Sequence, residues 1–259
     1  MTHEAYADGE LAALYDLVYA GYDDDLPLYE GFARRLDLPS LELGVGSGRV
    51  ALHLARQGCQ VVGLDASSHM LQRLRDGAAA EPATARRLRL VEGDMRTFDF
   101  PGERFGLIYC ALDTFEHMLT TADQEAALAR VARHLAAGGL FVAEMRTVTA
   151  VDWSVEPSPL VAEWTRADPS TGELVTKMRN GLASPAAQTT TDALIFDRIA
   201  ADGTVRRRAF EVTLRVSGRF EMELVLASAG LRLSAIYGDT SLSPFDDDSD
   251  RMIIVAGPS

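Results

Sequence analysis

The chain has 259 residues, 47% of them hydrophobic, and carries 25 Lys and Arg against 38 Asp and Glu, a formal charge of −13. This length fits one large domain, or one domain with a substantial insertion. The acidic balance argues against a nucleic acid as partner, because proteins that grip phosphates present a basic face. The apolar runs also fall short of the roughly 18 residues that a membrane span needs.

Residues 10–37 are predicted to form two helices. Leu11, Leu14 and Val18 recur at helical spacing in the first of them. Acidic residues at 23–25 interrupt the pattern, which resumes over 26–36 after Pro27, a residue favoured in the first turn of a helix.

The segment 41–50 contains the most informative pattern of the chain. An apolar strand runs into Gly44, Gly46 and Gly48, and a helical pattern follows at once. Glycine permits positive φ and lets a ligand approach the main chain, so this segment predicts a cofactor cradle between a strand and a helix. The dinucleotide fingerprint G-x-G-x-x-G would need its third glycine at Arg49. The loop therefore favours S-adenosylmethionine over a nicotinamide cofactor.

Strands and helices alternate from this loop onward. Strands are predicted at 41–45, 59–64, 88–92, 105–111 and 140–145, and helices at about 47–57, from about 67 and at about 122–135. Ser67 or Ser68 caps the second of these helices, and Gly138 and Gly139 end the third. Short apolar strands alternating with amphipathic helices predict an α/β fold with a parallel sheet covered on both faces.

The alternation stops after Met145 for roughly 70 residues, too many for a structureless loop in a compact domain. Phe210, Val212 and Leu214 alternate with polar residues, and 168–172 and 201–204 have the composition of hairpin turns. We therefore predict an antiparallel sheet inserted over 148–217, with 1–147 and 218–259 forming the parent core. Strands at 231–238 and 252–256 are too close in sequence for a parallel crossover, so they are predicted to pair antiparallel.

Five motifs in order resemble those of the class I S-adenosylmethionine-dependent methyltransferases. They are the glycine loop and the segments 61–71, 91–95, 105–111 and 134–139, and the resemblance extends over residues 11–257. It implies a Rossmann-like, doubly wound, seven-stranded and mostly parallel sheet with a reversed last strand. The inserted sheet resembles that of small-molecule methyltransferases, sugar-amine N-methyltransferases among them, where it covers the site or forms a dimer interface. We thus expect in-line methyl transfer to N, O or C of a small molecule, and a homodimer through the inserted sheet.

The resemblance also implies which residues bind S-adenosylmethionine. The three glycines would lie against its methionine part, and Glu42 and the carbonyl near Cys110 or Ala111 would lie close to its ammonium. Asp65 would accept hydrogen bonds from the ribose and Asp94 from the adenine amino group. The remaining contacts are Met95, whose backbone N–H faces the adenine ring, Ala66 or Met70 packed on the adenine, and Tyr15, which closes over the cofactor.

Each of these roles has a structural alternative in the sequence. Asp65 is also placed to cap the following helix, and Asp94 has the character of a solvated loop acid. Met70 and Tyr15 have the spacing of ordinary core residues.

The acceptor side is expected after the strands at 105–111 and 140–145. His117 is a candidate general base, Asp113 a candidate partner for an amine or hydroxyl, and Arg146 a candidate partner for a carboxylate or phosphate. Helix-start packing, capping and a surface ion pair are their respective alternatives. We predict no metal site, because Met145 and Arg146 occupy the place where a second carboxylate ligand for Mg²⁺ would be needed.

Two other functions remain open from the sequence. A nicotinamide oxidoreductase would use a similar sheet, and a catalytically silent module would keep the S-adenosylmethionine or S-adenosylhomocysteine pocket. The N-terminal residues lack a secretory signal, and Cys59 and Cys110 fall in predicted buried strands as reduced thiols, so we expect a cytoplasmic protein.

Overall fold

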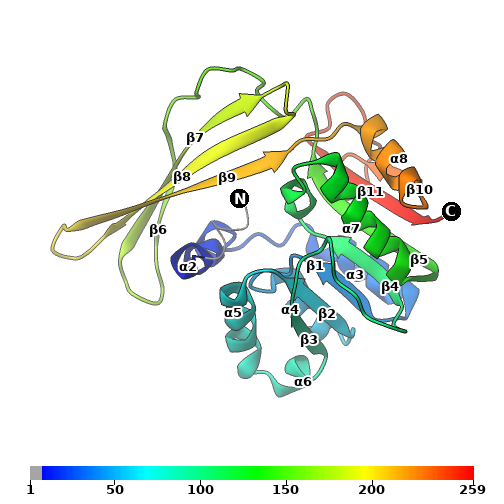
Figure 1. Ribbon diagram of the computed structural model, residues 1–259. Coiled ribbons are helices and arrows are strands. Elements are labelled where there is room, and N and C mark those ends of the chain that lie inside the picture. The colour runs from blue at the N-terminus through cyan, green and yellow to red at the C-terminus, as the bar shows by residue number, and fades with distance from the viewer. Residues whose placement is uncertain (1–7) are drawn as a thin grey trace.

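The computed structural model describes residues 8–259, so residues 1–7 of the predicted N-terminal cover lie outside the described part. One sheet has seven strands in the order β10-β11-β5-β4-β1-β2-β3 (Figure 1). Their bounds are β1 Ser40–Leu43, β2 Val61–Asp65, β3 Leu88–Glu92, β4 Phe105–Cys110, β5 Leu135–Arg146, β10 Leu231–Tyr237 and β11 Arg251–Pro258.

The sheet is parallel except at one strand. β1 pairs parallel with β2 and β4, β2 with β3, and β4 with β5. β11 runs antiparallel to both β5 and β10. The predicted reversed last strand and the antiparallel closing pair are therefore confirmed.

Helices cover both faces of this sheet, because its central strands are apolar on both faces. On β4, Ile108 and Cys110 join a core with α7 (Thr121–His134) and α8 (Arg219–Ser228). Leu107 and Tyr109 point the other way, into a core with α3 (Leu26–Leu36), α4 (Arg49–Arg56) and α5 (Ser68–Ala79). This two-sided burial is what a parallel sheet requires.

Two local features differ from the prediction. The helix that Gly138 and Gly139 were predicted to end stops at His134, and both glycines lie inside β5. A Cβ at Gly139 would lie 3.0 Å from the carbonyl oxygens of Phe105 and Gly106, so the glycine permits close approach to β4. A short helix, α6 (Pro82–Ala85), also forms where only a connection was expected.

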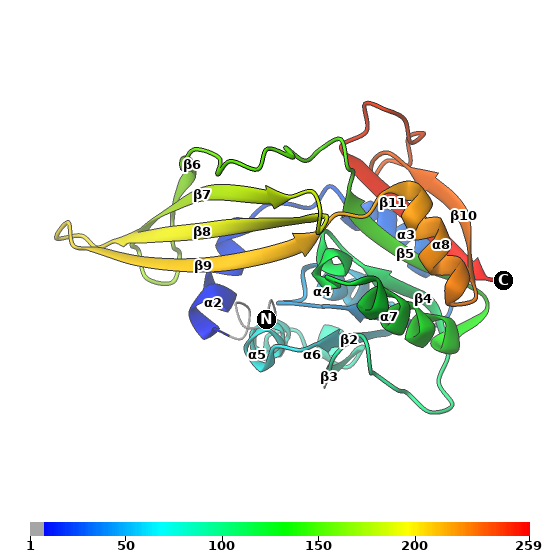
Figure 2. The ribbon, with the colours of Figure 1, turned by 45° about the horizontal axis from the view of Figure 1, so that its top comes forward.

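The predicted inserted sheet is present as four antiparallel strands in the order β6-β7-β8-β9. Their bounds are β6 Val161–Ala167, β7 Leu174–Ser184, β8 Thr189–Ile199 and β9 Val205–Arg215. Figure 2 shows the sheet extending away from the seven-stranded core, with its long hairpins reaching beyond α2 (Gly9–Val18).

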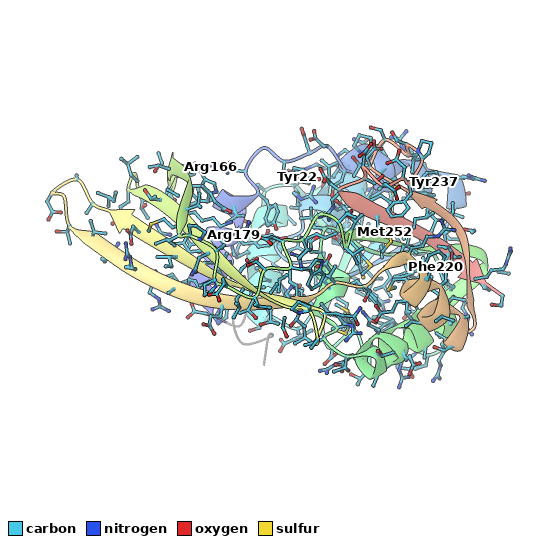
Figure 3. The ribbon with its side chains drawn as sticks, turned by 90° about the horizontal axis from the view of Figure 1, so that it is seen from above. Tyr22, Arg166, Arg179, Phe220, Tyr237 and Met252 are labelled. Carbon is cyan, nitrogen blue, oxygen red and sulfur yellow. The ribbon has the colours of Figure 1, made fainter. Side chains whose placement is uncertain are left out.

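Helix α2 packs on the inner face of this sheet. Leu11, Leu14 and Leu17 form a buried cluster with Val175, Phe196 and Phe210. Arginines of the sheet hold both ends of the helix. Arg166 of β6 (Figure 3) donates to the carbonyls of Leu17 and Val18, and Arg208 of β9 pairs with acidic residues at the N-terminal end. Cations near helix carbonyls and acids at the N-terminus both suit the helix dipole.

Within residues 8–259, no helix is both long enough and apolar enough to cross a membrane.

Candidate functional site

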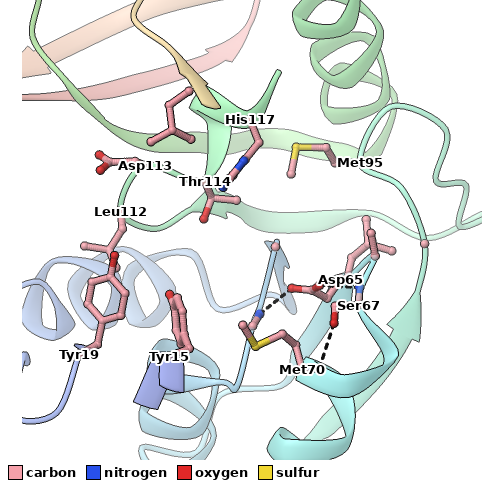
Figure 4. Close-up of a pocket in the computed structure, with 16 residues that line it drawn as sticks. Tyr15, Tyr19, Asp65, Ser67, Met70, Met95, Leu112, Asp113, Thr114 and His117 are labelled. Carbon is pink, nitrogen blue, oxygen red and sulfur yellow. Dashed lines mark hydrogen bonds between the residues drawn. The ribbon is translucent and has the colours of Figure 1, made fainter. Parts of the chain in front are cut away.

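A cavity opens at the carboxyl ends of β1, β2 and β4, where ligands of open α/β sheets bind (Figure 4). It holds about 920 Å³ of space, part of it open to solvent. α2 and the end of β9 close its outer side. The lining residues are Tyr15, Tyr19, Gly44, Gly46, Leu64, Asp65, Ala66, Ser67, Met70, Gly93, Met95, Leu112, Asp113, Thr114, His117 and Leu214.

The first two glycines of the loop form a bare backbone wall. Gly44 and Gly46 have φ of +69° and +55°. A Cβ at Gly44 would lie 2.3 Å from Cγ2 of Thr114, so no side chain fits there. Gly48 behaves differently, because it does not line the cavity and its missing Cβ leaves room for Leu74 instead. Its role is to let the start of α4 pack closely against α5.

Asp65 holds the glycine loop in this shape. One carboxylate oxygen accepts the backbone N–H of Gly46 at 2.7 Å, and the other accepts that of Ser67 at 2.8 Å. The cap of α5 is Ser67, whose Oγ accepts the N–H of Met70. The carboxylate of Asp65 therefore links the end of β2 to the loop after β1 and faces the same cavity.

The side of the cavity expected to hold the adenine is lined by Ala66, Met70, Gly93 and Met95. Asp94 lies between two of these residues but is not part of the lining. Its carboxylate accepts hydrogen bonds from the backbone N–H and the guanidinium of Arg96, which also pairs with Asp123.

Glu42 and Ala111 line a smaller adjoining cavity, which shares Tyr15, Gly44, Leu112 and Thr114 with the main one. Oε2 of Glu42 accepts the hydroxyl of Tyr109 at 2.9 Å. Burial raises the pKa of the Glu42 carboxyl to about 8, while that hydrogen bond and Arg49 act in the opposite direction. Cys110 is fully buried in the core and does not line either cavity.

The sequence predicted that Arg49 marks a departure from dinucleotide binding, and the structure shows what this arginine contacts. Its guanidinium forms a buried bidentate pair with Asp25, donates to the carbonyl of Tyr22 and stacks over the Tyr22 ring. It thereby ties the start of α4 to the segment between α2 and α3.

The other end of the cavity is formed by the turn after β4. A short 3₁₀ helix, η1 (Thr114–His117), begins after Asp113, and His117 and Thr114 both line the cavity. Tyr15 of α2 and Tyr19, the residue after the end of this helix, face them with ring centroids 4.7 Å apart, and Leu214 of the inserted sheet also lines the cavity. Burial, followed by the charge of Asp113, raises the pKa of Tyr19 to about 12.

Arg146 does not face the acceptor side of the cavity as expected. Its backbone N–H and guanidinium bind the buried carboxylate of Glu116 at 2.6–2.8 Å, and the guanidinium also donates to Thr190 of β8. Because Glu116 lies in η1, this arginine joins the turn that carries His117 to the inserted sheet. The prediction placed it correctly at the end of β5 but missed its buried partner.

Several residues of the site had no signal in the sequence. Leu112 has φ of +51°, a left-handed conformation that costs a non-glycine residue about 1–2 kcal/mol. Its N–H donates to the buried Glu144, which also accepts from Arg251. Leu214 and Tyr19 were visible only as strand and helix residues, because their place in the wall depends on how the two sheets and α2 meet.

No group of three or more His, Cys, Asp or Glu side chains in the described chain is arranged to hold a metal ion.

The chain is similar to known proteins in its sequence and in its structure. Residues 41–139 match the family model of the methyltransferase domain. A dTDP-3-amino-3,6-dideoxy-alpha-D-glucopyranose N,N-dimethyltransferase of Streptomyces fradiae is 33% identical over 152 residues, which cover 54% of this chain and 55% of that protein. The match thus spans about half the length of that relative.

Solved structures match over nearly the whole chain. The CcbJ methyltransferase of Streptomyces caelestis has a TM-score of 0.82 and 27% identity, with 98% of both chains covered. CalS10, an amino pentose methyltransferase of Micromonospora echinaspora solved with bound S-adenosylmethionine, has a TM-score of 0.70 and 23% identity, covering 95% of this chain and 97% of its own. The second likeness is one of fold.

The buried Glu42 predicts how stability depends on pH. Its pKa of about 8 in the folded chain exceeds the ordinary value of 4.5, so the folded state keeps a proton that the unfolded state releases between these values. The free energy of unfolding should therefore fall as pH rises through this window, by about 2–4 kcal/mol from this group. Urea unfolding of the wild type and of Glu42→Gln at pH 5.5 and 8.5 measures this free energy. We expect it to fall less with pH in the variant, and an equal fall in both proteins would contradict the raised pKa of Glu42.

Proposed function

The chain belongs to the class I S-adenosylmethionine-dependent methyltransferases, and on that premise we propose that it methylates an amine of a small-molecule acceptor. The observation that carries this proposal is one cavity with two chemically different ends. A bare glycine backbone and Asp65 line one end, and Asp113, His117 and two tyrosines line the other. Such a cavity suits a cofactor and an acceptor that meet in the middle.

The residues of the first end fit S-adenosylmethionine. The loop at Gly44 and Gly46 presents backbone without side chains to the cavity, and Asp65 suits the ribose hydroxyls. Ala66, Met70 and Met95 suit the adenine, with Asp94 beside them, and Glu42 and Ala111 in the adjoining cavity suit the ammonium. We assign Gly48 and Cys110 to packing, because neither lines a cavity.

S-adenosylmethionine supplies an electrophilic methyl group when bound. The chain's own residues then have to exclude water, orient the acceptor and receive a proton. Tyr15, Tyr19 and Leu214 enclose the acceptor end, and the Asp113 carboxylate attracts an amine. An amine attacks only in its neutral form, so His117 is the candidate to accept its proton.

The inserted sheet acts in this proposal as the cap of the acceptor end. Leu214 of β9 lines the cavity, and Thr190 of β8 contacts Arg146, which holds the turn after β4. The sheet also carries α2 and hence both tyrosines. The acceptor is therefore enclosed by residues that belong to, or are held by, the insertion.

Cofactor binding is tested with S-adenosylhomocysteine. Asp65→Asn places an amide against one of two backbone N–H donors and removes a charge, so affinity should fall by about 1–3 kcal/mol. Titration calorimetry measures the dissociation constant, with Asp76→Asn, on the exposed side of α5, as a control of equal charge change. Binding of NAD instead of S-adenosylhomocysteine by the wild type would contradict the proposed function.

Catalysis is tested with an extract of small metabolites and S-adenosylmethionine labelled in its methyl group. We expect mass spectrometry to find a labelled amine product. With that acceptor, His117→Ala should lower kcat roughly 100-fold if the histidine accepts the proton. An unchanged kcat would reduce His117 to a packing residue. Cofactor binding without any labelled product would favour a catalytically silent module.

We further propose that the outer face of the inserted sheet binds a second copy of this chain. By strand register, this face presents two largely apolar rows, Ala162, Met178, Ile195 and Ala209, and Ala167, Leu174, Ile199 and Val205. Between them Arg207 pairs with Asp197. A two-fold axis would set these opposite charges against those of the second copy.

Analytical ultracentrifugation measures the oligomeric state. Ile195→Glu, which places an unpaired charge in an apolar row, should convert a dimer into a monomer. Phe220→Glu is the matched control, because Phe220 is a 73% exposed apolar residue of α8, outside the inserted sheet (Figure 3). A monomeric wild type at tens of micromolar would refute this interface.

A further inference from the structure

The turn after β4 carries backbone strain at the acceptor end of the cavity. Leu112 has φ of +51°, where the Cβ of a leucine crowds the following carbonyl. Such a conformation persists only where surrounding groups hold it, and it is found preferentially at functional sites. Leu112 lines both adjoining cavities, and the next residue, Asp113, lines the main one.

A single buried carboxylate is linked to this turn at two points, once directly and once through Arg251. Glu144 lies on β5 with its side chain 2% exposed, and its Oε2 accepts the N–H of Leu112 at 3.2 Å. Its Oε1 accepts from Nε of Arg251 at 3.1 Å. Nη2 of Arg251 lies 2.7 Å from Oδ1 of Asp113. Glu144 is thus linked to the backbone of one cavity residue and to the side chain of the next.

We propose that Glu144 is a positioning residue, which keeps Leu112 in its left-handed conformation and, through Arg251, fixes the direction in which Asp113 meets the acceptor. Glu144 itself does not line the cavity, so it acts on the acceptor only through these two residues. The inference rests on the proposed function, because it takes Asp113 as the group that contacts the acceptor.

Stability alone does not account for a carboxylate at this position. A buried ion pair stabilises a fold weakly, and well-packed apolar residues of similar volume often do better. An apolar side chain on β5 would leave the N–H of Leu112 without this acceptor and Arg251 without this partner. Rotation of Leu112 to negative φ would then relieve the strain and turn Asp113 away from its present direction.

The first experiment compares Glu144→Gln with the wild type. The neutral amide is a weaker acceptor and brings a donor against Arg251, so hydrogen exchange at the Leu112 amide should rise about tenfold or more. With the amine found in the extract screen, KM should rise roughly tenfold. The dissociation constant of S-adenosylhomocysteine should stay within about twofold, because the cofactor end is unchanged.

Asp113→Asn is the matched control. It should raise KM for the same amine while leaving exchange at the Leu112 amide within about twofold of the wild type, since Glu144 still holds that backbone. If Glu144→Gln does not fold, Glu144→Asp tests the same contacts, because its shorter carboxylate cannot reach both Leu112 and Arg251.

The second experiment is a rescue. Leu112→Gly and Leu112→Ala remove the same side chain from the wall, but only glycine adopts positive φ without penalty. In the Glu144→Gln background, Leu112→Gly should therefore remove the part of the rise in KM that comes from the Leu112 backbone, whereas Leu112→Ala should remove none of it. Equal KM values for the two double variants would overturn the proposal.

Unchanged exchange at the Leu112 amide in Glu144→Gln would overturn it as well. That measurement needs no substrate, so it tests the hold on Leu112 even if the wild type neither binds S-adenosylhomocysteine nor methylates an amine. Failure of those two activities would instead refute the proposed function.

Discussion

The shape of the site depends on one constraint, which is that β1, β2 and β4 end together at one edge of the sheet. Backbone groups there leave the strand ladder and need other partners, because unpaired buried N–H groups are costly. Asp65 is the partner of two of these groups, since its two carboxylate oxygens accept the N–H groups of Gly46 and Ser67. The same carboxylate thus holds the glycine loop, binds the backbone of the residue that caps α5 and lines the cavity.

The inserted sheet and the core meet through α2 and through charged side chains. Apolar residues of α2 pack on the sheet, whereas Asp16 of the same helix pairs with Arg73 of α5. Arg146 joins Glu116 of the core to Thr190 of the sheet. Because ion pairs are directional and apolar packing is not, these contacts orient the cap while the apolar cluster holds it in place.

Buried charged side chains at the acceptor end of the cavity also hold backbone groups of a loop in place. Glu116 and Glu144 are both buried, and burial raises the pKa of each carboxyl, while Arg146 and Arg251 lower the respective values. Removing such groups from water costs free energy that their pairing only partly returns. In exchange, the turn from Leu112 to His117 is held by hydrogen bonds and ion pairs near both ends, in addition to the apolar packing of Phe115.

The amino-acid sequence was enough to predict the order of strands and helices along the chain, the antiparallel closing pair, the inserted sheet and the residues at the ends of β1 and β2. These follow from hydrophobic period, glycine spacing and motif order, which are local properties of the chain. Gly46, Asp65 and His117, which the sequence offered as candidates, all line the cavity. The tertiary structure alone decided that Arg146 binds Glu116, that Glu144 holds Leu112, and that Tyr19 and Leu214 complete the wall. Each of these contacts joins residues that are distant in sequence, so its geometry depends on how whole elements pack, and no local pattern records that.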